Sequence, residues 1–202
     1  MTLWRAEEPL ILASQSKARQ TLLAQAGIPF EALPADLDER ALQQASGLSS
    51  AKEIATLLAR AKAMSVSSEH AGRLVVGADQ TLSLGDRVFS KPAGRVQAAE
   101  QLRGLAGHTH ELHSAVAVAY DGEILFAEVA VARMTMRPLS EEAISVYLNE
   151  AGDAVTTSVG AYQLEGLGIH LFARVEGDHF TVLGLPLPPL LTFLRSRGLL
   201  AV

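Results

Sequence analysis

Short apolar runs alternate with segments of helical periodicity along the chain. The run Pro9–Ala13 predicts a buried strand, and Ser14–Ala26 before Gly27 predicts a helix with a glycine stop. A second helix is expected over Ala51–Val66, where the apolar stripe continues to Lys62. Further strands are expected at 28–33 and 74–79.

Two-residue turn signals then predict hairpins at Gly85-Asp86, Asp121-Gly122 and Gly177-Asp178. These hairpins would join strands 81–84 to 87–89, 110–120 to 123–134 and 169–175 to 179–183. The remaining helices are expected at 96–105, 140–149 and 188–197. Helices interspersed among hairpins favour a mixed central sheet with flanking helices, so we expect one two-lobed α/β domain over residues 1–202.

Composition excludes several classes of protein. The chain has 202 residues, of which 49% are hydrophobic and 19% charged, as in a globular protein with its own core. No apolar run approaches the roughly 18 to 20 residues of a membrane span, and Met1–Glu8 lacks the pattern of a secretory signal. We therefore expect a cytoplasmic protein without a membrane partner. Since the chain contains no Cys, disulfides, thiolate zinc sites and a cysteine nucleophile are excluded.

The charge balance bears on the partners. With 17 Lys and Arg against 22 Asp and Glu, the net charge is −5, and no basic run offers a phosphate-neutralising face. We expect no nucleic-acid partner. A small anionic ligand held by a few local cations remains open.

The first predicted helix begins in a pattern that suits an anion. A strand leads into Ser14 and Ser16, so two hydroxyls, free backbone N–H groups and the positive end of the helix dipole coincide. Lys17 and Arg19 follow within one turn, and an arginine can present a planar fork to phosphate oxygens. The alternative is that a serine caps the helix while both cations are solvated.

Carboxylates supply the other candidate chemistry. Asp79 follows an apolar run, where an unpaired charge would cost several kcal/mol, so it needs a partner, a metal or a function unless it only forms a strand-end turn. Asp36, Asp38 and Glu39 could hold Mg²⁺ or form only a loop. Lys91 alone indicates little, and the six His have no metal spacing.

A glycine-rich segment, Gly160–Gly168, enters a strand and carries Glu165 among small residues that allow a ligand close to the backbone. It has neither the dinucleotide fingerprint nor the Walker lysine. Generic turn chemistry is the alternative interpretation.

Taken together, these segments resemble the Maf family of nucleotide pyrophosphatases. They match in order over nearly the whole chain: Leu12–Arg19, Asp36–Glu39, Ala59–Lys62, Val75–Asp79, Lys91-Pro92, Gly160–Tyr162, Glu165–Gly168 and Val175–Pro186. The resemblance implies an inosine-triphosphate-pyrophosphatase-like fold with a deep cleft, and a possible homodimer. It also implies hydrolysis of a nucleoside triphosphate to a monophosphate and pyrophosphate with a divalent cation, Mg²⁺, Mn²⁺ or Co²⁺.

The resemblance implies roles for individual residues. Asp79 matches the family's general base, and Glu39 matches an acidic position near the metal; whether Asp79 takes the proton or holds the metal stays open. The positions that match phosphate-handling residues are Ser14, Ser16, Arg19, Lys62 and Lys91.

Base choice follows three positions of the family, which match Ala18, Gln80 and Glu165. Family members acting on dTTP and UTP typically carry Arg, Thr and Gln there, whereas Gln80 and Glu165 resemble the branch acting on 7-methyl-GTP. A carboxylate can accept the adjacent N1–H and N2–H of guanine in a bidentate pair. The alternatives are a dTTP or UTP pyrophosphatase and a nucleotide-binding regulator of cell division without turnover.

Overall fold

The computed structural model describes residues 3–202, so Met1 and Thr2 of the expected domain lie outside the described residues. The chain divides into two compact units. The first contains the residues up to Gln80, His113–Ala130 and His179–Val202, and the second contains Thr81–Leu112 and Val131–Asp178. This division agrees with the expected two-lobed chain, whereas a cleft stays a prediction.

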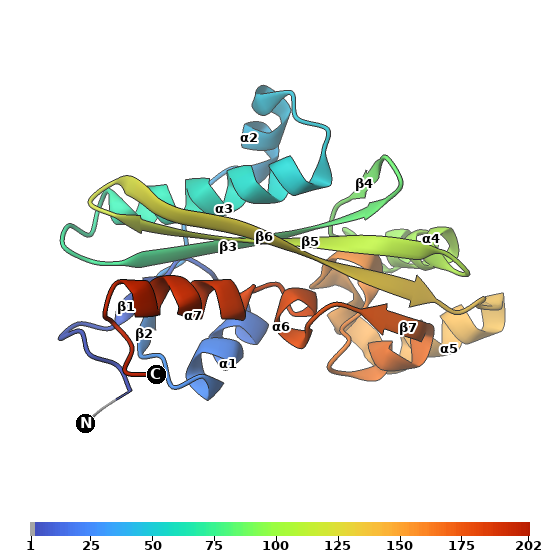
Figure 1. The fold of residues 1–202 in the computed structure, drawn as a ribbon. Helices are drawn as coiled ribbons and strands as arrows, with labels where there is room; N and C mark the ends of the chain where they lie inside the picture. Colours follow the sequence, from blue (N-terminus) through green and yellow to red (C-terminus); the bar gives the residue numbers. More distant parts are fainter. Residues whose placement is uncertain (1–2) are drawn as a thin grey trace. The chain divides into compact units, whose positions relative to one another are not determined.

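The α/β class and the mixed sheet are confirmed. The sheet has seven strands in the order β2-β1-β3-β5-β6-β7, and β4 pairs with β3. The strands are labelled in Figure 1. The pairs of β1 with β2 and β3 are parallel, and those of β3 with β4 and β6 with β7 are antiparallel. The strands are β1 Leu10–Leu12, β2 Phe30–Ala32, β3 Val75–Leu84, β4 Arg87–Phe89, β5 Thr109–Tyr120, β6 Glu123–Met136 and β7 Phe172–Glu176.

The helices are α1 Lys17–Gln25, α2 Glu39–Ser46, α3 Ala51–Ser67, α4 Arg95–Leu105, α5 Glu141–Ala151, α6 His179–Val182 and α7 Leu187–Ser196. Three 3₁₀ turns are η1 Gly152–Thr156, η2 Val159–Ala161 and η3 Leu167–Leu171. No helix among the described residues is long and apolar enough to cross a membrane.

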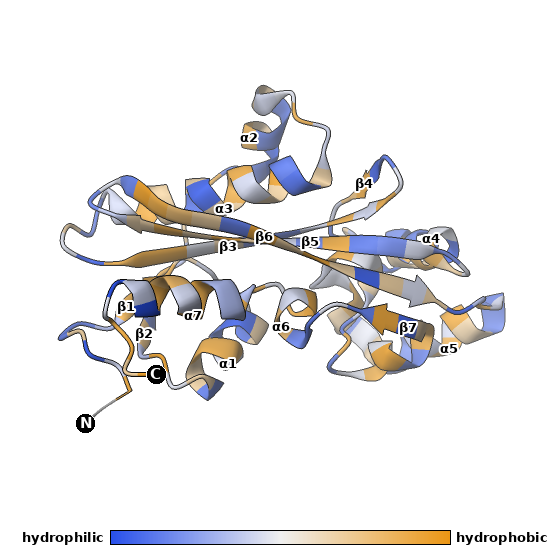
Figure 2. Ribbon diagram, in the orientation of Figure 1, coloured by the Kyte–Doolittle hydropathy of each residue, from blue (hydrophilic) through white to orange (hydrophobic). Residues whose placement is uncertain are grey.

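In the first unit, helices cover both faces of the strands. Side chains of β1, β3 and β5 that include Leu12, Val76 and Val118 pack with α1 and α7 in one apolar cluster. On the other face, Ala115, Ala117 and Ala119 of β5 pack against α3. Hydrophobic and hydrophilic positions alternate along α3 and α7, as expected for helices with one buried side (Figure 2). Successive residues of a strand therefore face different helices.

Turn chemistry explains where several elements end. Gly27 has φ +68°, the left-handed conformation that stops α1. Asp121 and Gly122 both have positive φ, 47° and 74°, which is the pattern of a type I′ hairpin turn between β5 and β6. Leu84 pairs with Arg87, which confirms the hairpin at Gly85-Asp86.

Three sequence predictions are corrected. Residues 179–183 do not form a strand after a hairpin at Gly177-Asp178, because they contain α6. The sequence prediction is wrong here since so short an apolar run has no periodicity that distinguishes a strand from a helix. The strand expected at 169–175 begins only at Phe172, after η3. The helix expected from Ser14 begins at Lys17, because Ser16 is its extended N-cap residue.

Candidate active site

Asp79 lies on β3 and faces α3. Its side chain is 10% exposed, and Lys62 Nζ donates a hydrogen bond of 2.7 Å to its Oδ1. The helix can approach this closely because residue 77 is a glycine: a Cβ there would lie 2.2 Å from the carbonyl oxygen of Ala59. The buried carboxylate therefore has a partner, as its position in an apolar strand requires, and that partner is Lys62.

Lys62 joins two carboxylates. Its Nζ also lies 2.9 Å from Glu39 Oε1, at the start of α2, and the Lys62 side chain is only 12% exposed. Asp38, just before Glu39, caps α2 by accepting a hydrogen bond from the amide of Ala41. The interpretation of these acidic residues as part of a loop is thus incomplete, because Asp38 is the N-cap of α2 and Glu39 is its first residue.

Burial and nearby charges act on Asp79 in opposite directions. Burial raises the pKa of Asp79 above its ordinary value, the charges of Lys62 and Arg19 lower it, and Glu39 raises it further. Burial likewise lowers the pKa of Arg19, against the charges of Asp79 and Glu39. A carboxylate with a raised pKa beside cations is the state expected of a general base.

The turn before α1 brings the predicted serines together. The amide of Ser16 donates to Ser14 Oγ at 3.2 Å, and Ser16 Oγ accepts from the amide of Arg19 at 3.4 Å. The capping interpretation is thus correct for Ser16, and both hydroxyls lie at the N-terminal end of α1. Ala18 lies in the first turn of this helix and is partly buried.

Two of the three guanidinium nitrogens of Arg19 donate hydrogen bonds to other groups of the protein. Its Nε donates to the carbonyl of Gly184 at 2.8 Å, and its Nη1 donates to the carbonyl of Ala78 at 2.8 Å and to Ser14 Oγ at 3.2 Å. Nη2 is the guanidinium nitrogen that makes no hydrogen bond within residues 3–202. Arg19 therefore contacts the residue that precedes Asp79 in β3.

Gln80 follows Asp79 and faces the other side of the sheet. Its Nε2 donates to Ser114 Oγ at 2.9 Å and to the carbonyls of Thr181 and Val182 at 3.1 and 3.0 Å. Because two of these acceptors are carbonyls, the amide nitrogen must face them, and Oε1 is left as an acceptor. Sequence reasoning missed Ser114, although a serine among the apolar residues of β5 was a visible signal.

The other predicted site residues belong to the second unit. Lys91 follows β4, Glu165 lies between η2 and η3, and both are exposed. Their roles stay predictions. The first unit, in contrast, links Ser14, Ser16 and Arg19 to β3 at Ala78, and it links Glu39 and Lys62 to Asp79. Gln80 is the next residue of β3 but makes its contacts on the other face of the sheet.

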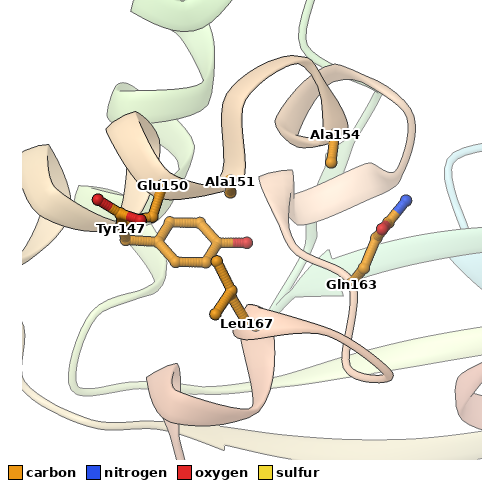
Figure 3. Close-up of a pocket in the computed structure, with 7 residues that line it drawn as sticks. Tyr147, Glu150, Ala151, Ala154, Gln163 and Leu167 are labelled. Carbon is orange, nitrogen blue, oxygen red and sulfur yellow. The ribbon is translucent and has the colours of Figure 1, made fainter.

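A pocket of about 200 Å³ lies beside the segment that carries Glu165. Figure 3 shows the Tyr147 ring reaching from α5 toward the turn that carries Leu167. Within the same unit the fully buried His110 lies 2.7 Å, Nε2 to Oη, from Tyr162. Burial lowers the pKa of His110 to about 4, so this histidine is an uncharged core residue.

Two carboxylates near Lys62 fit a divalent cation. Asp79 Oδ2 and Glu39 Oε2 accept no hydrogen bond from the described part of the chain. The other oxygen of each carboxylate, Asp79 Oδ1 and Glu39 Oε1, contacts Lys62 Nζ. No group of three or more His, Cys, Asp or Glu side chains suited to a metal occurs among residues 3–202. One or two carboxylates with phosphate oxygens are the usual ligands of Mg²⁺, so the donor set fits a cation that arrives with a polyphosphate.

Comparison with known proteins decides the family. The family model described as Maf-like protein matches residues 9–197. The chain belongs to the Maf-like family. This Maf-like chain is 68% identical over all 202 residues to a protein of Bradyrhizobium diazoefficiens named nucleoside triphosphate pyrophosphatase, with both chains covered completely.

Two further similarities bear on the Maf-like chain. A protein of Rhizobium etli named 7-methyl-GTP pyrophosphatase is 50% identical over 191 residues, which cover 94% of this chain and 96% of the relative. Among solved structures, a nucleoside-triphosphatase, dITP/XTP pyrophosphatase, of Mycobacterium abscessus matches with a TM-score of 0.41 at 15% identity, covering 95% of this chain and 96% of that one.

Proposed function

We propose that this protein hydrolyses the bond between the α and β phosphates of a nucleoside triphosphate, with a 7-methyl-GTP-like nucleotide as substrate. The observation that carries the proposal is the buried carboxylate of Asp79, paired with Lys62 in a chain of the Maf-like family. Names of relatives agree: nucleoside triphosphate pyrophosphatase at 68% identity and 7-methyl-GTP pyrophosphatase at 50%.

Asp79 is the proposed general base. Its carboxylate takes a proton from a water molecule, whose oxygen forms a bond to the α phosphorus. The bond from that phosphorus to the bridging oxygen of the β phosphate breaks, and pyrophosphate leaves with the electron pair. The nucleoside monophosphate is the second product, and its new phosphate oxygen is the oxygen of the water.

Cationic and N–H groups of the first unit are proposed to hold the polyphosphate. The α1 N-terminus beside Ser14 and Ser16 offers backbone donors, and Arg19 Nη2 and the Lys62 ammonium offer positive charge. Lys91 of the second unit is proposed as a further phosphate ligand. These groups offset negative charge that increases on the phosphates as water approaches.

Asp79 and Glu39 are the proposed ligands of a divalent cation, Mg²⁺, Mn²⁺ or Co²⁺. When bound, such a cation shields the phosphate charges and lowers the pKa of a coordinated water. Lys62 remains between the two carboxylates and limits their mutual repulsion.

The acceptor atoms of Gln80 and Glu165 support a substrate whose nucleobase carries adjacent N–H donors, as guanine does. Gln80 presents Oε1 because its Nε2 is held by protein carbonyls. Glu165 is an exposed carboxylate on the second unit that could accept N1–H and N2–H of guanine, and methylation at N7 adds a positive charge that favours it. The small side chain of Ala18 provides no stacking surface, so we assign it no attractive contact.

The test is a substrate panel with the purified protein and each of the three cations. It contains 7-methyl-GTP, GTP, dTTP and UTP, and phosphate and pyrophosphate are quantified separately. We expect pyrophosphate and monophosphate, with the highest kcat/KM for a guanine nucleotide. Preference for dTTP or UTP would contradict the base assignment, and absence of turnover on the whole panel would contradict the enzymatic function. Tight triphosphate binding without turnover would favour the alternative, a nucleotide-binding regulator.

A further inference from the structure

The residues on both sides of Asp79 are held by one short segment, Thr181–Gly184, which includes the end of α6. Ala78 is linked to it through Arg19, which donates to the carbonyls of both Ala78 and Gly184. Gln80 is linked directly, because its Nε2 donates to the carbonyls of Thr181 and Val182. All of these residues belong to the first unit.

Ser114 completes this network from β5. Its hydroxyl donates to the carbonyl of Thr181 at 2.7 Å and accepts from Gln80 Nε2 at 2.9 Å. Ser114 and Thr181 are both fully buried. Buried hydrogen bonds of this kind fix side-chain orientation, because breaking one leaves a polar group unsatisfied.

Gly184 is packed against both linked side chains. Its φ is +88°, and a Cβ there would lie 3.3 Å from Arg19 Nη2, 3.5 Å from Arg19 Nε and 3.7 Å from Gln80 Cβ. A side chain at this position would therefore press on Arg19 and approach Gln80.

We infer that Gly184 and Ser114 are positioning residues for Asp79: with Thr181 and Val182 they fix Arg19 and Gln80, and so the backbone on either side of the carboxylate. A general base must be held close to its reacting water, and a displacement of about 1 Å can cost about 100-fold in rate. This inference rests on the proposed function for its kinetic consequence, whereas the network itself is independent of substrate.

The test compares Gly184→Ala with Gly72→Ala. Gly72 has φ +75° in the same unit, and no atom lies within 4 Å of the place its Cβ would take, so Gly72→Ala reproduces the backbone strain without the contact. We expect Gly184→Ala to lower kcat about 10-fold to 100-fold for every triphosphate that is turned over. Because Arg19 is also a proposed phosphate ligand, KM should rise as well. Gly72→Ala should lower the melting temperature with kcat unchanged.

A second readout needs no turnover. Hydrogen exchange of the Gln80 side-chain amide, assigned by its absence in Gln80→Glu, should be slow in the unsubstituted protein and in Gly72→Ala. The exchange should be fast in Gly184→Ala and in the milder variant Ser114→Ala. Ser114→Ala takes the place of Gly184→Ala in the test if Gly184→Ala does not fold. Slow exchange in both variants, or an unchanged kcat in both, would overturn the inference. Absence of turnover in the unsubstituted protein would instead count against the proposed function, and the exchange measurement would still decide the network.

Discussion

Lys62 Nζ lies 2.7 Å from Asp79 Oδ1, and both side chains are nearly buried, at 12% and 10% exposure. Lys62 comes from the middle of α3, and Asp79 comes from β3 where Gly77 lets the helix approach. The pair explains how the apolar strand tolerates a carboxylate, because removal of either partner would leave a buried charge with less compensation.

Replacing Asp79 with asparagine removes the proposed base while retaining side-chain volume. We expect the rate of pyrophosphate release to fall at least about 100-fold, the lower end of the contribution of a general base. Asp86→Asn, at an exposed hairpin turn, is the control and should retain activity. Full activity of Asp79→Asn would exclude this residue as the base.

The pH dependence should respond to Lys62. Asp79 must be ionised to act, and its pKa is raised by burial and lowered by Lys62, so activity is lost as pH falls through that pKa. In Lys62→Met the pKa of Asp79 should rise and the acid limb of the kcat profile should move to higher pH. Lys62→Arg keeps the charge and should move the limb less. An acid limb at the same pH in Lys62→Met and in the unsubstituted protein would show that Asp79 does not control this limb.

Glu165→Gln tests the base assignment. Loss of a charged hydrogen-bond acceptor worth roughly 1.5–3 kcal/mol should lower the preference for guanine over pyrimidine triphosphates about 10-fold to 100-fold. The ratio of kcat/KM values measures this preference. Glu142→Gln, on the exposed start of α5, should leave the ratio unchanged. A ratio unaffected by Glu165→Gln would remove this side chain from base recognition.

His110 predicts a pH dependence of stability. Its pKa in the folded protein is about 4 against an ordinary 6.5, so the unfolded chain binds more protons between these values. The free energy of unfolding should therefore rise with pH across this window, by about 3 kcal/mol from this residue. Denaturant titrations of His110→Gln should show a flatter profile, and exposed His108→Gln should not. Parallel profiles for all three proteins would argue against a neutral buried histidine.

Gly77→Ala should destabilise the protein because α3 leaves no room for a side chain. A Cβ at this position would lie 2.2 Å from the carbonyl oxygen of Ala59 and 2.6 Å from the amide nitrogen of Ala63. We expect a loss of about 1–3 kcal/mol or more, typical of overpacking, visible as a lower melting temperature. Gly104→Ala, within α4 and clear of close neighbours, should stabilise slightly. Equal melting temperatures for the two variants would contradict the close packing of α3 on β3.

Local patterns in the sequence determined much of the fold. Buried β1, the apolar stripe of α3 and the Asp121-Gly122 turn depend on residues close in the chain, so periodicity and turn preference sufficed to predict them. The same holds for the serines before α1 and for Asp79 at an apolar strand. The prediction of a strand at 179–183 is wrong, because the four residues of α6 are too few for a helical period to show in the sequence.

Tertiary structure alone decided the partners. Arg19 reaches Gly184 across 165 positions of the chain, and Gln80 reaches Thr181 across 101. The sequence marked Arg19 as a phosphate ligand, but it could not show that two of its nitrogens bind backbone carbonyls. Hydrogen-bond partners distant in sequence depend on how strands and helices pack, and packing is a property of the whole chain that no local pattern records.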